Sequence, residues 1–175
     1  MTRCSTRPGL LLGLLICPML MGGCLEEELR DLSDDLESLD LEVRLAAVNR
    51  LKEIDDDRAD ELLVEALESD EELIDAAGNV LAYKGRLYKT DEKPDKINEL
   101  VEQTLKDTHL EEMVRAKAAW ILGEIGDRES IPALKGFTGD GKAQVAANTV
   151  EALKKLGYNT DGVAFAMADD GTIKP

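Results

Sequence analysis

The segment "VRAKAAWILGEIGD", residues 114–127, is the clearest copy of a pattern that recurs along this chain. Its counterparts are "VRLAAVNRLKEIDD" at 43–56, "LIDAAGNVLAYKG" at 73–85 and "VAANTVEALKKLG" at 145–157. Apolar residues spaced four, four and three apart place one stripe on an α-helix in each copy. The second copy departs from the stripe at Lys84. A pattern repeated at starts 30, 41 and 31 residues apart predicts a stack of similar helical units.

A second helix is predicted after each of the first three copies, at residues 59–70, 94–107 and 130–140. Pro94 and Pro132 fall near the starts of two of these helices, where proline is tolerated. Neither helix of a pair can bury its apolar stripe alone, so successive pairs must stack on one another. The sequence therefore predicts an all-α fold, an α-solenoid of about four helical hairpins. A plain helical bundle is the alternative.

The copies resemble HEAT repeats, most closely the short HEAT-like repeats named after phycobilisome lyases. The resemblance rests on an acid before Val-Arg, then Ala, Leu and Gly, and a final Gly-Asp. The matching residues are Asp40, Val43, Arg44 and Leu51 in the first copy, and Val114, Arg115, Leu122, Gly123, Gly126 and Asp127 in the third. The resemblance implies that Arg44 and Arg115 pair with acids at an adjoining turn. Contact with a partner is the other possibility for these two arginines.

The N-terminus has the three parts of an export signal. Residues 1–9 are basic, residues 10–21 are almost entirely apolar, and Gly22-Gly23 precede Cys24. This arrangement resembles the lipobox of bacterial lipoproteins, which implies a signal peptide at residues 1–23 and acylation of Cys24. The protein is therefore expected in the bacterial cell envelope, lipid-anchored to the outer membrane and facing the periplasm. An ordinary secreted protein with an incidental cysteine is the alternative.

The remaining chain divides into three parts. Residues 24–42 form the lipidated N-terminus and a capping helix, residues 43–157 form the repeat domain, and residues 158–175 form a C-terminal cap or tail. A heptad of leucines marks the capping helix; its members are Leu25, Leu29, Leu32, Leu36 and Leu39. A zipper partner or a spacer from the membrane are other possibilities for this helix. Asp40 and Asp70 are predicted N-caps, and Thr108 with Glu111 has capping-box spacing.

A basic, aromatic-rich insertion of residues 83–93 lies between the second and third copies. The simple interpretation is a solvated loop between two helices. The alternative is a contact loop, because insertions in repeat proteins tend to collect on a binding face.

Composition argues against most chemistry. The formal net charge is −16, and removing residues 1–23 removes two arginines and no acid, which makes it −18. Nucleic acid and anionic lipid surfaces are poor partners for such a chain, so contact with the membrane is expected through the lipid anchor only. Beyond Cys24 there is no cysteine, and His109 is the single histidine. Hydroxylases built from HEAT repeats bind iron through His-Glu pairs, and this chain has none. We expect no catalytic residue, no metal and no cofactor.

Protein binding is the expected function, as a scaffold in the bacterial envelope. In the family the second helices line the concave surface. Their expected outward residues are Glu61, Glu65, Glu68, Glu99 and Glu102, which favours a protein partner with a basic surface. The alternative is an accessory factor or chaperone for an enzyme or for a lyase-like cofactor-attachment system.

Overall fold

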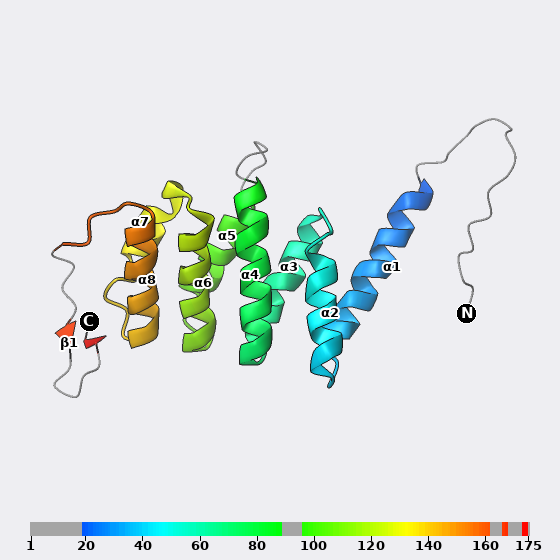
Figure 1. Cartoon of the computed structure of the whole chain (residues 1–175), viewed down its shortest axis with the longest axis horizontal. Helices are drawn as coiled ribbons and strands as arrows, with labels where there is room; N and C mark the ends of the chain where they lie inside the picture. The colour runs from blue at the N-terminus through cyan, green and yellow to red at the C-terminus, as the bar shows by residue number, and fades with distance from the viewer. Residues whose placement is uncertain (1–18, 89–95, 162–165, 168–172, 175) are drawn as a thin grey trace, which may run out of the picture.

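The computed structural model describes residues 19–88, 96–161, 166–167 and 173–174, and it describes side chains at 24–88 and 96–161 (Figure 1). Short 3-10 turns extend two of the helices. The elements are α1 (Met19–Leu36), α2 (Leu41–Leu51), α3 (Asp57–Glu65), η1 (Ala66–Glu68), α4 (Glu71–Tyr88), α5 (Lys96–Lys106), α6 (Glu112–Ile125), η2 (Arg128–Ser130), α7 (Ile131–Lys135), α8 (Ala143–Lys155), β1 (Ala166–Met167) and β2 (Ile173–Lys174).

The helices form two layers, as an α-solenoid requires. The first helices of the four repeats, α2, α4, α6 and α8, stand side by side and each packs on the next (Figure 1). The second helices α3 and α5 pack on each other in the other layer, and α7 packs on α8. The predicted all-α solenoid is confirmed. The second helix predicted at residues 130–140 is shorter in the structure: α7 ends at Lys135, and turns follow it.

One aliphatic core runs along the stack, and the fully buried side chains of the repeats supply it. Examples from successive helices are Leu51, Leu63, Leu81 and Leu122, each 0% exposed. Burying a leucine side chain contributes about 1.5–3 kcal/mol relative to leaving it in water, so these stripes hold the hairpins together.

Small residues allow the first helices to approach closely. A Cβ atom added to Gly123 of α6 would lie 2.7 Å from the backbone Cα of Ala152 on α8. A Cβ on Gly85 of α4 would lie 2.6 Å from the Ile125 side chain of α6. Glycine is therefore required at Gly123 by its distance from a backbone that cannot move aside.

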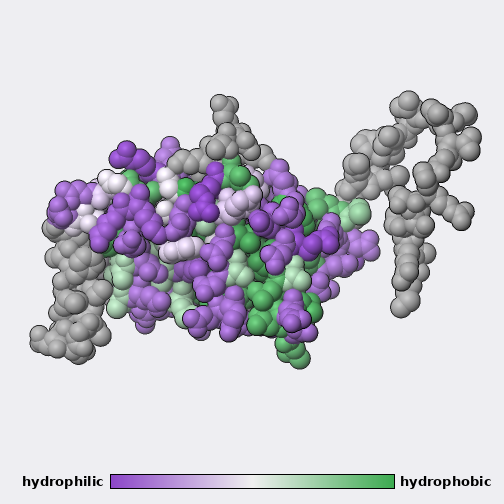
Figure 2. Space-filling model, viewed as in Figure 1, coloured by the Kyte–Doolittle hydropathy of each residue, from purple (hydrophilic) through white to green (hydrophobic). Residues whose placement is uncertain are grey.

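Helix α1 covers the first repeat and packs on α2 and α3. Leu29 and Leu32 are buried, and Leu25 and Leu36 pack against the core. The prediction that Leu39 belongs to the leucine seam is wrong, because α1 ends at Leu36 and Leu39 is 102% exposed. Figure 2 shows a mostly hydrophilic surface on this side, with apolar residues gathered where α1 meets α2.

Two predictions of helix starts hold and one does not. Asp40 Oδ1 accepts a hydrogen bond from the Glu42 amide at 2.9 Å, and Asp70 Oδ1 accepts one from the Leu73 amide at 3.2 Å. The predicted capping box of Thr108 and Glu111 is wrong. Helix α6 begins at Glu112, Glu111 takes the N-cap position without a side-chain cap, and Asp107 instead accepts from the His109 amide at 2.9 Å.

The insertion at 83–93 is not a simple loop. Residues 83–88 are the last six residues of α4, and residues 89–93 lie outside the described part of the chain. At the C-terminus, β1 and β2 form a two-residue antiparallel pair, with β2 beside α8. Ile173 and Lys174 thus form a short strand within the predicted C-terminal cap or tail.

Candidate functional site

The predicted acidic residues gather on the layer of second helices. Glu61, Glu65 and Glu68 follow one another at spacings of four and three on α3 and η1, so they share a face. All three side chains are exposed, as is Glu99 on α5. Glu102, also on α5, is only half-buried rather than fully outward.

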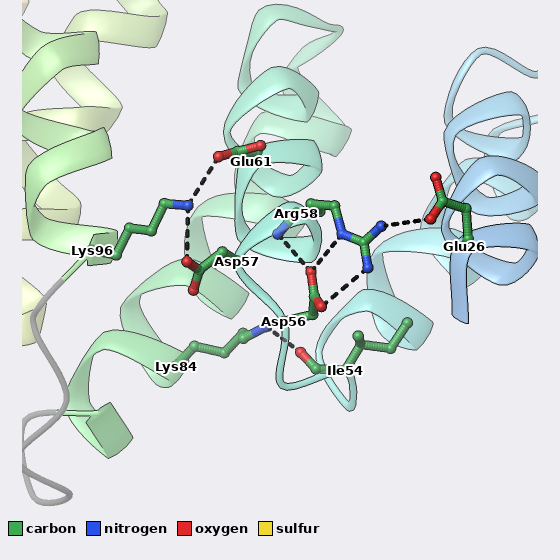
Figure 3. A network of polar contacts seen from close by, with 8 residues as sticks. All are labelled: Glu26, Ile54, Asp56, Asp57, Arg58, Glu61, Lys84 and Lys96. Carbon is green, nitrogen blue, oxygen red and sulfur yellow. Dashed lines mark hydrogen bonds and ion pairs between the residues drawn. The ribbon is translucent and has the colours of Figure 1, made fainter. Parts of the chain in front are cut away.

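Lys96 joins the two acidic helices at one end. Its Nζ atom lies 3.0 Å from Glu61 on α3 and 3.1 Å from Asp57 at the start of the same helix (Figure 3). These two pairs together raise the pKa of Lys96. Because α3 and α5 also pack directly, their carboxylates form one surface, which we call the acidic face and define as Glu61, Glu65, Glu68, Glu99 and Glu102.

Local cations neutralise part of the acidic face. Lys96 pairs with Glu61, and Lys106 pairs with Glu102 at 2.8 Å along α5. Within the described residues no ion pair reaches Glu65, Glu68 or Glu99. These three carboxylates are therefore the part of the face that carries uncompensated charge.

Arg44 and Arg115, at equivalent places in two repeats, fasten each repeat to the next. Arg44 donates to the Ser38 carbonyl at 2.8 Å and forms an ion pair with Asp70, which precedes α4. Arg115 donates to the Leu105 carbonyl at 3.1 Å and lies 2.6 Å from Asp140. The structural pairing expected for both arginines is confirmed, and the Arg115 side chain is only 5% exposed.

The Arg115 guanidinium governs the ionisation of Asp140. Burial opposes charge on this carboxyl, but hydrogen bonds from Arg115 and from the Lys142 amide outweigh burial and lower the pKa of Asp140. The amide bond, at 2.9 Å, also ties the carboxylate to the start of α8. Asp140 is thus a fixed anion between two repeats.

A buried ion pair that the sequence did not reveal joins the first two repeats. Lys84 of α4 and Asp60 of α3 lie 2.6 Å apart, with side chains 3% and 1% exposed. The Lys84 ammonium also donates to the carbonyl of Ile54 at 2.7 Å (Figure 3). It donates to the carbonyl of Leu51 at 3.3 Å. One carboxylate and two carbonyl oxygens thus surround the ammonium. Lys84 is therefore a structural residue, and it belongs neither to a solvated loop nor to a contact loop.

The repeat alignment explains why this pair exists. Lys84 and Asp60 align with Leu156 and Ile131 of the later repeats, which pack in or against the apolar core. The sequence signal was the break at Lys84 in the stripe. A cation in an apolar stripe needs a buried anion, and the aligned position of the facing helix holds an aspartate.

The middle interface uses a third chemistry at the same place. Asn98 of α5 aligns with Asp60 and is buried, and its amide donates to the Asp127 carboxylate at 2.9 Å. Successive interfaces therefore carry an ion pair, an amide–carboxylate bond and an apolar contact. A hairpin stacked on the wrong neighbour would leave a buried charge or amide unmatched.

Burial dominates the titration of the Asp60 region. It raises the pKa of Asp60 despite the nearby Lys84, and the pKa of Tyr88 is raised by its own burial and then by Asp60. At the neighbouring surface, Arg58 donates to both oxygens of Asp56 and thereby lowers the pKa of Asp56. Arg58 also reaches Glu26 of α1 at 3.4 Å, which ties α1 to this turn (Figure 3).

Acylation of Cys24 stays a prediction, and the structure shows only where this residue lies. Cys24 lies exposed on α1 with a free thiol. No helix in the described ranges is both long and apolar enough to cross a membrane. In the same ranges, no cluster of His, Cys, Asp and Glu side chains is arranged to hold a metal ion.

The architecture defines a class of protein, the α-solenoids of stacked helical hairpins. Comparison with known families then identifies the repeats. Residues 91–168 match the HEAT repeats, and residues 43–69 match the PBS lyase HEAT-like repeat. The chain thus contains HEAT repeats, in agreement with the sequence resemblance. No characterised protein matches it by sequence.

A solved structure, that of deoxyhypusine hydroxylase, shows a likeness of fold. The structure of human deoxyhypusine hydroxylase in complex with glycerol superposes with a TM-score of 0.62 and 24% identity, over 79% of this chain and 46% of that one. The chain thus spans less than half the length of this neighbour. An engineered protein gives a TM-score of 0.43 and 22% identity, over 78% of this chain and 65% of that one. At these identities the likeness concerns the fold alone.

Proposed function

We propose that this protein is a HEAT-repeat scaffold of the bacterial envelope, tethered by lipid on Cys24, and that its acidic face binds a protein with a basic surface. The observation that carries the binding proposal is the group Glu65, Glu68 and Glu99. These exposed carboxylates share one surface, and no ion pair in the described chain compensates them. HEAT repeats commonly mediate protein–protein interaction, and extended repeat surfaces suit that role.

Electrostatics should govern the rate and selectivity of this binding. Each exposed ion pair contributes only about 0–1 kcal/mol, so the acidic face alone does not give high affinity. Complementary charge instead speeds encounter and suppresses wrong partners, and its effect weakens with added salt. The partner must therefore also contact residues outside the acidic face.

Charge reversal with a matched control tests the proposal. The test variant replaces Glu65, Glu68 and Glu99 with lysine. The control replaces three exposed acids elsewhere, Glu37, Glu53 and Glu151, so both variants change net charge equally. Proteins captured from envelope extract at low and at high salt are compared with those captured by the unchanged chain.

The expected result is loss of a salt-sensitive partner from the test variant and its retention by the control. Equal capture by both variants, or capture that ignores salt, refutes the acidic face as the binding surface. A chromophore that copurifies with the chain would instead favour the accessory-factor role.

The anchor is proposed from the lipobox resemblance and the exposure of Cys24. One acyl chain gives only marginal membrane attachment, so stable anchoring requires at least two. Mass spectrometry of the N-terminal peptide from envelope protein should find it beginning at an acylated Cys24. An N-terminal peptide without lipid would remove the anchor from the proposal and leave the acidic face to be judged by capture.

The proposed role is binding rather than catalysis. Support comes from the side chains themselves, since His109 is exposed and the buried charged residues Asp60, Lys84 and Arg115 are all engaged in contacts between repeats.

A further inference from the structure

Two of the three exposed large apolar side chains lie at one end of the helical layer, the end at which α4 stops. Among described residues the exposed large hydrophobic side chains are Leu39, Tyr83 and Leu87. Tyr83 and Leu87 are four residues apart on α4 and so share a face, at 41% and 45% exposure.

The end of α2 completes the patch. Lys52 lies over the Tyr83 ring, 4.6 Å from its centroid, and Ile54 shares a shallow hollow with Tyr83 and Leu87. We call these four residues the turn-edge patch, because they surround the turn that leads from α2 to α3. An aromatic ring, two aliphatic side chains and a lysine are the residue types that settle at a membrane–water interface.

Cys24 lies toward the same end of the helical layer. Helix α1 runs antiparallel to α2, so its N-terminal half lies beside the C-terminal end of α2 (Figure 1). Glu28 of α1 pairs with Arg50 in the last turn of α2, and Cys24 lines a hollow with Arg50. At 1.5 Å per residue, Cys24 lies about 6 Å beyond Glu28 in the direction of the turn.

We propose that the turn-edge patch docks into the headgroup region of a zwitterionic lipid surface and so fixes the orientation of the anchored solenoid. This inference rests on the proposed acylation of Cys24, which would hold the same end of the molecule at the membrane. Two contacts at one end, a lipid and an apolar patch, resist rotation that a lipid alone permits. The acidic face then extends away from the bilayer along the second helices.

Charge decides which lipid surface fits. Glu53, Asp55 and Asp57 are exposed in or next to the same turn, and the chain as a whole is strongly acidic. An anionic surface repels these carboxylates, whereas a zwitterionic one does not. Lys52 alone does not offset the repulsion between these carboxylates and an anionic surface.

A tryptophan placed in the patch tests the docking. Trp120 is the single tryptophan, so Trp120→Phe gives a dark background. The test variant adds Leu87→Trp. The control adds Leu39→Trp, which lies in the turn between α1 and α2 at the opposite end and is fully exposed. Each protein is isolated from envelopes and reconstituted into phosphatidylcholine vesicles that contain brominated lipid.

A second preparation separates failure of the anchor from failure of the docking. A chain that begins at Cys24 keeps every core residue that the structure describes and has one thiol. Coupling this thiol to a maleimide lipid in the same vesicles supplies a tether even if the natural protein carries none. Mass spectrometry of the envelope protein reports acylation independently.

The expected result is that brominated lipid quenches Leu87→Trp at least about twofold more than Leu39→Trp, since a docked ring lies at headgroup level. Replacing part of the phosphatidylcholine with phosphatidylserine should reduce the difference. Equal quenching of the two variants on the chemical tether overturns the docking. A blue shift of Leu87→Trp that grows with protein concentration without vesicles also overturns it, because it assigns the patch to a second copy.

Discussion

The buried pair of Lys84 and Asp60 yields the sharpest prediction. Lys84→Met keeps most of the side-chain volume but leaves a carboxylate that is 1% exposed without its cation. Removing one partner of a buried ion pair costs about 3–5 kcal/mol. The carbonyl of Ile54 also loses its 2.7 Å hydrogen bond. We therefore expect a loss at the upper end of this range.

The loss should be local to the first interface. Each repeat contacts only its neighbours, so a weakened interface allows the N-terminal helices to unfold before the rest. Trp120 lies on α6 and reports the later repeats, whereas circular dichroism reports all helices. In urea, the dichroism of Lys84→Met should fall before the tryptophan fluorescence changes. The exposed substitution Lys154→Met should shift neither signal, since such changes stay within about 0.5 kcal/mol.

A double variant separates charge from packing. Asp60→Ile with Lys84→Leu copies the apolar residues found at the aligned positions 131 and 156. Replacing a buried ion pair with apolar residues of similar volume is often neutral or stabilising by about 1–4 kcal/mol. The double variant should therefore recover the stability lost in Lys84→Met. A double variant no more stable than the single one would refute the reasoning, as would a single-variant loss below about 1 kcal/mol.

The pH dependence follows from the raised pKa of Asp60. Because the folded-state pKa lies above the unfolded value, protonation of Asp60 favours the folded state. Its contribution to stability therefore decreases as the pH rises from the ordinary value of 3.8 through the raised one. The deficit of Lys84→Met should shrink when the urea titration is repeated in acid, where Asp60 is neutral. A deficit that does not change with pH would mean that packing, and not charge, causes it.

Other positions give predictions of known sign. Gly123→Ala should lower the free energy of unfolding by about 1–3 kcal/mol through overpacking. Gly139 has open space around it, so Gly139→Ala should lower it far less. Equal losses in urea titration would contradict the close approach of α6 and α8. The pKa of Asp140 is lowered, so this carboxylate contributes stability above its ordinary pKa, and that stability is lost as the pH falls through the folded-state pKa. Asp140→Asn should therefore flatten the acid limb of the curve of stability against pH. An unchanged acid limb would mean that Arg115 does not hold the carboxylate. Leu32→Ala should cost about 2–5 kcal/mol and leave the mass in sedimentation unchanged; a shift in mass instead indicates a zipper partner.

Local sequence was sufficient for the repeat, because the apolar stripe of each copy defined a helix face. The resemblance to HEAT-like repeats implied that Arg44 and Arg115, which follow valine, pair with an acid at an adjoining turn. Asp70 and Asp140 supply these acids in the structure. Such features are predictable because they repeat and because their partners lie close in the chain or one repeat away.

Some features near the ends of helices could not be predicted. The last turns of α4 resemble a basic loop in sequence, yet they are helical, and Lys84 within them contacts Asp60, Leu51 and Ile54 of the preceding repeat. Thr108 has good capping chemistry, but α6 begins later. Helix ends depend on contacts with neighbouring elements, which short-range patterns do not contain.

The sequence by itself determined the helical class, the repeat period and the acidity of the second helices, because each of these is a property of composition or of spacing. The lipobox at Cys24 stays a prediction. Only the tertiary structure decided which acids are compensated, that a lysine and an aspartate meet in the core, and that Tyr83, Leu87 and Cys24 lie at one end. These facts depend on how hairpins stack, and stacking brings together residues that are far apart in the chain.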